Sequence, residues 1–197
     1  MSLPDPTDAA AYDESLAKIT IGAPQRLSGL IEIREYDPAW PDLYAREAER
    51  IRGVLGERVV RLEHAGSTSV PGLPAKPIVD MVLEVPDSSD EPAYVPDLQA
   101  AGYVLRIREP DWFEHRLFKG PDTNINLHVF SAGCTETGRM VAFCDWLRMN
   151  EADRDLYART KRDLASRDWK YVQQYADAKT AVVAEIMTRA GVAPEGP

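Results

Sequence analysis

Apolar and polar positions alternate through much of the first two thirds of the chain, and they follow a helical period in the last third. Alternation over a few residues predicts a half-buried strand, and apolar positions three or four apart predict a helix. The pattern predicts strands at residues 31–36, 59–65, 78–85, 103–108, 114–119 and 125–130. It predicts helices at about residues 8–19, 40–55 and 95–101, and from residue 137 onward. This order indicates an α+β fold in which a small mixed sheet is followed by a helical C-terminal layer.

Two stretches rich in turn-forming residues organise the chain. The loop GPDTN at residues 120–124 joins the last two expected strands and predicts a hairpin. The first thirty residues carry several Pro and Gly residues, and their one helix has a thin apolar face made of Leu16 and Ile19. We expect residues 1–30 to form an extension that docks loosely or stays mobile. The main domain is then expected at residues 31–197.

Composition narrows the function classes. The 197 residues contain 23 Lys and Arg and 32 Asp and Glu, so the net charge is −9 and general nucleic-acid binding is unlikely. A local basic pocket for one small anion stays open. No apolar run reaches the ~18 residues that span a membrane, and the N-terminus has no secretory pattern, so we expect a cytoplasmic protein. The pattern does not indicate an oligomeric state.

The most informative loop, residues 63–80, leaves one expected strand and enters the next. Gly66 allows close backbone approach, and Ser67 and Thr68 offer hydroxyl groups. Such a corner can cradle a phosphate group, or it can be a tight structural turn. Lys76 then either neutralises a phosphate or pairs with a carboxylate.

Asp80 lies in a strongly apolar strand, where an unpaired carboxylate would be costly. It therefore faces a metal ion, another cation or a cluster of donors, or it is a structural acid bonded to loop amides. Sequence alone supports both interpretations.

The stretch HAGSTSVPGLPAKPIVDM closely resembles the signature of the GrpB family. YDPAW near residue 36, NLHVF at 126–130 and the RDLYARTKRDLA…YADAKTA pattern at 154–181 support the resemblance, which runs from residue 31 to the C-terminus. The family implies a bacterial protein with a nucleotidyltransferase-like core, and some of its members are fused to dephospho-CoA kinase. Active nucleotidyltransferases have a Gly-Ser pair after the first core strand. They bind two magnesium ions through two acids on the next strand and one on a later strand.

The chain departs from that pattern at the second acid. Asp80 matches the first acid, but Val82 occupies the position expected for the second. Glu84 shares the face of Asp80, yet four residues along a strand span about 13 Å, too far to share one ion.

The third acid is also replaced, because the polar face of the strand at 125–130 carries Asn126 and His128. One carboxylate with nitrogen ligands suits a single divalent metal, Mg, Mn or Zn with the softer ions favoured, or no metal. A triad of His64, Asp80 and His128 is the candidate metal site, with both histidines as packing residues as the alternative. His128 is also a candidate general base.

Several cations are candidate ligands for an anion. Arg116 lies on a strand face, where it could bind a ligand or pair with an acid. Lys179 is the one charge in an apolar helical stripe, so it either extends to the edge of the core or points into the cleft beside the acidic strand. Lys161 and Arg148 are expected on solvated helix faces.

Two functional hypotheses follow. In the first, the chain binds a small anion or nucleotide. This hypothesis includes the case in which the chain is a nucleotidyl or phosphoryl transferase of unknown substrate. The catalytic candidates are then Asp80 and His128, and the ligand-binding candidates are Gly66, Ser67, Thr68, Lys76, Arg116 and Lys179. In the second, the missing acid marks a catalytically silent relic that acts as a binding or regulatory module, which the fused relatives link to coenzyme A metabolism.

Overall fold

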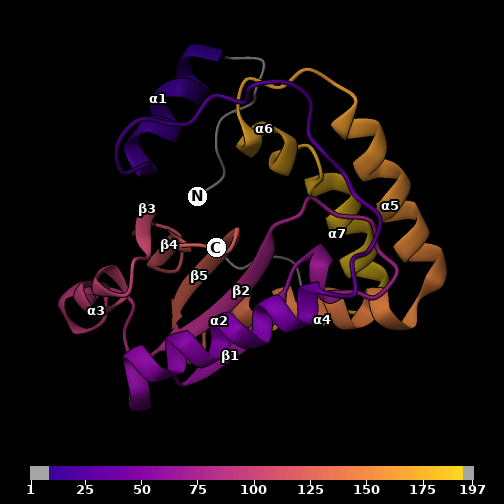
Figure 1. Ribbon diagram of the computed structural model, residues 1–197. Coiled ribbons are helices and arrows are strands. Elements are labelled where there is room, and N and C mark those ends of the chain that lie inside the picture. The colour runs from indigo at the N-terminus through magenta and orange to yellow at the C-terminus, as the bar shows by residue number, and fades with distance from the viewer. Residues whose placement is uncertain (1–8, 193–197) are drawn as a thin grey trace.

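A five-stranded mixed sheet forms the centre of the computed structural model, which describes residues 9–192 (Figure 1). The strands are β1 (Arg61–Ala65), β2 (Val79–Val85), β3 (Val104–Glu109), β4 (His115–Lys119) and β5 (Ile125–Ser131), in the spatial order β1-β2-β5-β4-β3. β2 and β5 are parallel, and the other neighbours are antiparallel. The expected hairpin at residues 120–124 joins β4 to β5.

Helices surround this sheet and make up the C-terminal third. They are α1 (Ala9–Ile19), α2 (Trp40–Leu55), α3 (Val95–Ala100), α4 (Thr135–Met149), α5 (Glu151–Ala165), α6 (Val172–Asp177) and α7 (Thr180–Arg189). Short 3-10 turns lie at Gly56–Arg58, Ser67–Ser69 and Glu91–Ala93. The α+β class, the mixed sheet and the helical C-terminal layer are confirmed.

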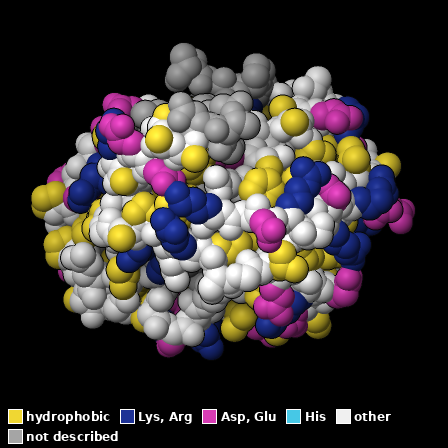
Figure 2. Space-filling model, turned by 90° about the horizontal axis from the view of Figure 1, so that it is seen from above, with side chains coloured by type: hydrophobic (Ala, Val, Ile, Leu, Met, Phe, Trp, Pro, Cys, Tyr) yellow, Lys and Arg dark blue, Asp and Glu magenta, His cyan; other side chains and the backbone are white. Residues whose placement is uncertain are grey.

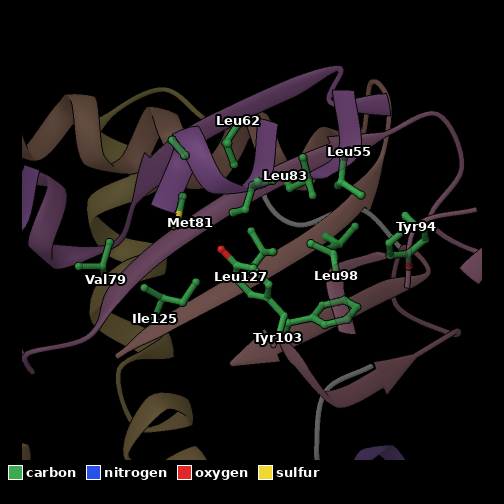
Figure 3. Packing of buried hydrophobic residues seen from close by; sticks show 14 of the residues in the cluster. Leu55, Leu62, Val79, Met81, Leu83, Tyr94, Leu98, Tyr103, Ile125 and Leu127 are labelled. Atoms are coloured by element: carbon green, nitrogen blue, oxygen red, sulfur yellow. The ribbon is translucent and has the colours of Figure 1, made fainter. Parts of the chain in front are cut away.

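One face of the sheet is apolar and packs against α2 and α3 (Figure 3). Alternate residues of β2 and β5 point to this face, including Met81, Leu83 and Leu127, which are fully buried. On α2, Ile51 and Leu55 lie four residues apart and meet them on one helical stripe. We call this side the core face.

The opposite face carries Asp80, Val82 and Glu84 of β2, with Asn126 and His128 beside them on β5. The start of α4 covers part of it. The rest of the C-terminal layer forms a separate apolar cluster in which α4, α5 and α7 pack together and against the loop before β2. We call this side the cleft face.

The expected strand at 31–36 is wrong. Residues 20–34, which we call the strap, cross from the sheet to the C-terminal helices (Figure 1). Its pairings are isolated bridges: Thr20 with Ile107, Arg26 with Tyr171, and Arg34 with Ala75. The apolar alternation has another cause, because Ile31 and Ile33 pack against Leu164 and Trp169.

The helix of the N-terminal extension is held by buried side chains. Tyr12 and Leu16 pack on Tyr171, and Tyr12 Oη donates a hydrogen bond to Asp177 Oδ2 at 2.6 Å. Residues 1–8 of that extension lie outside the described residues, and the boundary at residue 30 stays a prediction. Across residues 9–192, every helix is too short or too polar to cross a membrane.

Candidate functional site

A cleft of about 250 Å³ lies between the cleft face of the sheet and the C-terminal helices. Gly66, Ser67 and Asp80 line its sheet side. Arg139, Tyr157 and Lys179 are among the residues that line its helical side. Four of the sequence-predicted residues, Gly66, Ser67, Asp80 and Lys179, are therefore brought together here. Thr68, Lys76, Arg116 and the three histidines do not line this cleft.

Gly66 is required by its close contact with Asp80. Its φ is +66°, and a Cβ at this position would lie 2.3 Å from Asp80 Oδ2. The strand register explains the contact, because Ala65 pairs with Asp80 and the chain turns directly afterwards. Sequence analysis expected close backbone approach at Gly66. The group that approaches is the carboxylate of Asp80.

Asp80 is the end of a polar row that crosses three strands. Asn126 lies beside it in the register, and Asn126 Nδ2 donates a hydrogen bond to Asp80 Oδ1 at 2.7 Å. Lys119 pairs with Asn126 across the hairpin, and its amine donates to Asn126 Oδ1. The row fixes the orientation of the carboxylate. Sequence reasoning did not select Lys119, although the hairpin register places it beside Asn126.

The charge of Asp80 acts on four lysines. Lys76, Lys119, Lys161 and Lys179 all interact electrostatically with Asp80, which favours their charged forms. Burial acts more strongly in the opposite direction. It lowers the pKa of Lys161 to about 6 and that of Lys179 to about 8. The pKa values of Lys76 and Lys119 are also lowered, chiefly by burial.

Two of these amines share an aromatic neighbour. Lys179 Nζ lies 4.7 Å from the centroid of the Tyr175 ring, and Lys76 Nζ lies 5.3 Å from it. The ring face attracts both cations and lets them lie close together. Of the two interpretations of Lys179, the structure has its side chain on the wall of the cleft.

Lys161 does not lie on a solvated face, so that expectation is wrong for it, whereas the Arg148 side chain is 32% exposed. Lys161 is 2% exposed, and its amine hydrogen-bonds to Ser67 Oγ at 2.9 Å and to the carbonyl of Pro74. The Arg148 guanidinium donates to the carbonyl of Ser69 through Nε and Nη2. Both residues tie the C-terminal helices to the loop before β2.

His64 lies on the core face, so the proposed metal triad is not formed. In β1 it pairs with Met81, whereas Ala65 pairs with Asp80, and adjacent strand positions point to opposite faces. Its ring stacks on Tyr44 of α2 with centroids 4.8 Å apart, and burial lowers its pKa to about 4.

Thr68 is occupied by the same histidine. His64 Nε2 and Thr68 Oγ1 are hydrogen-bonded at 3.0 Å, and Thr68 is buried. Thr68 therefore closes the turn from the inside and does not offer its hydroxyl to the cleft.

His128 shares the face of Asp80 but belongs to the next row, beside Val82. It lies 3.0 Å from His115, measured between Nδ1 and Nε2, and His115 Nδ1 lies 2.7 Å from Glu109 Oε2. Burial and the neighbouring His115 hold the pKa of His128 well below its usual value. Within residues 9–192, no group of three or more His, Cys, Asp and Glu side chains could hold a metal ion.

Arg116 is not part of the site. It pairs with Val129 in the register, so its side chain belongs to the core face. Its guanidinium binds Glu91 at 2.5 Å and Glu114 at 3.1 Å. The expected role as an anion ligand is therefore wrong, and the alternative of pairing with acids is confirmed.

Fold and site together define an α+β protein with a five-stranded mixed sheet and, at one side of it, a cleft lined by Asp80 and Lys179. The family model described as GrpB protein matches residues 30–189. The chain belongs to the GrpB family.

Relatives and a solved structure agree with this assignment. A UPF0157 protein of Halalkalibacterium halodurans is 61% identical over 90% of this chain and 91% of its own length. The crystal structure of conserved protein GrpB from Enterococcus faecalis matches with a TM-score of 0.71 and 30% identity, over 81% of this chain and 96% of that one. A dephospho-CoA kinase of Mycobacterium tuberculosis is 29% identical over 73% of this chain but only 42% of the kinase.

Proposed function

We propose that the chain binds a nucleotide or a similar small phosphorylated ligand in the cleft and transfers a nucleotidyl or phosphoryl group from it. The observation that carries this proposal is that Lys179 lines the cleft together with Asp80, whose charge also acts on Lys76, Lys119 and Lys161. Partial burial disfavours the charged forms of Lys76, Lys119 and Lys179, and Asp80 supplies one negative charge for these three amines. A phosphate group entering the cleft supplies the missing charge.

The arrangement is local, which makes it informative. The whole chain has a net charge of −9. Figure 2 shows basic and acidic side chains interleaved over the face seen from above. A surface of that kind does not attract nucleic acid as a whole. Cations gathered at and behind the wall of one cleft instead focus the field on one small anion.

We assign roles by position. Lys179 lies on the wall of the cleft, and Lys76 joins it at the Tyr175 ring, so these two amines neutralise phosphate oxygens. Ser67 lines the opposite wall. Asp80, oriented by Asn126, limits the repulsion among the lysines while the cleft is empty of ligand.

The donor set does not fit a pair of magnesium ions held by the protein. Val82, where a second acid is expected, is fully buried with Ala65 and Phe130. Magnesium is often bound through one carboxylate together with substrate phosphates. We therefore propose the divalent metal in a narrower form, as one ion that accompanies the phosphates and takes Asp80 as its protein ligand.

The buried Val82 also favours a second candidate, a module that binds the ligand without reacting with it. Similarity to part of a dephospho-CoA kinase makes coenzyme A precursors suitable ligands to test for this module. Binding alone does not distinguish the two candidates. Release of pyrophosphate or of a nucleoside diphosphate supports the transferase and not the binding module.

Thermal unfolding with a panel of nucleotides, pyrophosphate and coenzyme A precursors, each with and without Mg²⁺, Mn²⁺ or Zn²⁺, tests the proposal. A ligand at 100 times its dissociation constant adds about 2.7 kcal/mol, or roughly 5–10 °C for a chain of this size. Lys179→Met should lose the shift, and Lys18→Met, which removes a solvent-exposed lysine of α1, should keep it. Flat curves across the panel would contradict the proposal.

A further inference from the structure

Ser67 and Lys161 form a pair that anion binding alone does not require. Ser67 is partly exposed and lines the cleft, whereas Lys161 lies behind it, 2% exposed. Their Oγ and Nζ atoms are 2.9 Å apart. The second hydrogen bond of the amine, to the carbonyl of Pro74, fixes its position. The hydroxyl therefore faces the ligand space and the amine faces the hydroxyl.

We propose that Ser67 is a nucleophile with Lys161 as its general base, a Ser–Lys dyad that takes a phosphoryl or nucleotidyl group from a phosphoanhydride bound in the cleft. The choice of substrate class rests on the proposed function above. A serine acts as a nucleophile when a base lies within hydrogen-bond distance, about 2.6–3.2 Å, and is itself held by a third group. Lys161 and the Pro74 carbonyl meet both conditions.

The surroundings of Lys161 supply a base that is neutral at pH 7. The charged and titratable groups that face its amine are Asp80 on β2, Cys144 on α4, Tyr157 and Arg162 on α5, and Lys179 just before α7. Burial, Lys179 and Arg162 lower the pKa of Lys161 to about 6, against the opposing effects of Asp80 and Cys144. A neutral amine donates to the Pro74 carbonyl and accepts the Ser67 proton.

The step balances without any further reactant. The proton of the Ser67 hydroxyl moves to Lys161 Nζ as Oγ forms a bond to phosphorus. The bridging P–O bond of the anhydride breaks, and the leaving group departs with the electron pair: pyrophosphate in nucleotidyl transfer, or a nucleoside diphosphate in phosphoryl transfer from a nucleoside triphosphate. Its negative charge meets Lys179, and the new ammonium of Lys161 lies in the field of Asp80. Transfer to a second substrate or to water then returns Ser67 to its free form.

A fluorophosphonate tests the nucleophile without knowledge of the substrate, because it reacts with activated serines and releases fluoride. We expect peptide mass spectrometry to find the label on Ser67, at a rate that rises with pH through about 6 as Lys161 loses its proton. General-base assistance contributes about 100-fold or more. Lys161→Met and Lys161→Arg should both lose this rate enhancement. The arginine cannot act as a base because it stays protonated at every accessible pH.

Controls separate chemistry from folding. Ser67→Ala should take up no label at this peptide, and Ser166→Ala, on the exposed C-terminal end of α5, should behave as wild type. The pH profile of the wild-type protein needs no variant, so it remains decisive even where a Lys161 variant fails to fold. Labelling of Ser67 no faster than of Ser166, or a rate independent of pH between 5 and 8, would overturn the dyad.

The outcomes also separate this inference from the proposed function. If nucleotides stabilise the protein but Ser67 is inert, the dyad proposal is wrong and the proposed anion site stands. If Ser67 is reactive but no phosphorylated ligand stabilises the protein, the dyad proposal stands and its phosphoanhydride substrate class is wrong.

Discussion

The two faces of the sheet are built from the same strands yet have opposite properties. On the core face, Met81, Leu83 and Leu127 are fully buried against helices, and their burial stabilises the fold. On the cleft face, the positions between them carry Asp80 and Asn126, next to lysines whose charged forms burial disfavours. One residue along a strand therefore separates a side chain packed in the apolar core from one that belongs to the polar row beside the cleft.

Truncation on the core face should have the largest effect on stability. Leu83→Ala removes a fully buried side chain between the sheet and α2, at a cost of about 2–5 kcal/mol in the free energy of unfolding. Urea unfolding measures this loss. Ligand affinity of the remaining folded protein should not change, and a changed affinity would mean that the two faces are not independent.

Gly66→Ala should both destabilise the fold and disturb the cleft face, because the new methyl group would overlap Asp80 Oδ2. Backbone strain at φ +66° adds to this overlap, for a total of roughly 2–4 kcal/mol and a displaced carboxylate. Gly72→Ala is the matched control, since its φ is +77° and no atom lies within 4 Å of the added carbon. Equal losses in the two variants, measured by urea unfolding, would contradict the close contact.

Lys179→Met should raise stability by about 1 kcal/mol while it weakens anion binding, the reverse of a core mutation. Burial and Lys76 lower the pKa of Lys179 to about 8, so removing its charge removes a cost of folding. Thermal unfolding in the absence of ligand tests the sign. A less stable variant would show that the amine is satisfied within the free protein.

The lysines also predict a pH dependence with a defined sign. Because the pKa of Lys179 is about 8 and that of Lys161 about 6, both below the usual 10.5, the folded chain binds fewer protons than the unfolded chain in the range above pH 6. Their contribution to stability therefore rises with pH from about 6 to 10.

Anion binding should show the opposite trend, because it requires the protonated amine. Sulfate, whose own charge is constant in this range, should bind about tenfold more weakly at pH 9 than at pH 7 if one proton with a pKa near 8 is coupled to binding. Calorimetric titration at both pH values measures the ratio, and equal affinities would contradict a role for Lys179.

The smallest effect on ligand binding is expected at His64. His64→Gln removes the stacking on Tyr44, and we expect a loss of about 1 kcal/mol in stability. Residue 64 lies on the core face, away from the cleft, so ligand binding should not depend on it. Affinity for anions and any response to divalent metals should stay within twofold of wild type in the same titration. A lost metal response would restore His64 to the site.

The sequence predicts most of the sheet, because its signals are local. The loop at 120–124 specifies the hairpin, and the alternation in β2 and β5 specifies which residues share the face of Asp80. The resemblance to the GrpB family selects the loop with Gly66 and Ser67, which lines the cleft.

The remaining features depend on long-range packing. Lys161 lies on a helix that is polar on most of its surface, and only the docking of α5 on the loop before β2 turns this lysine inward. Arg116 and Phe118 share one face of β4, and the polar residue gives no local sign that it belongs to the core side. The strap alternates like a strand because its apolar residues pack on α5.

The most direct test of the account is a calorimetric titration of wild-type protein and Lys179→Met with ATP at pH 7, with Lys18→Met as the control. We predict saturable binding to wild type and the control, and at least about tenfold weaker binding to Lys179→Met, which corresponds to about 1.4 kcal/mol. Equal affinities in all three proteins, or no binding of ATP, pyrophosphate or sulfate to wild type, would contradict the claim that the cleft beside Lys179 is an anion site.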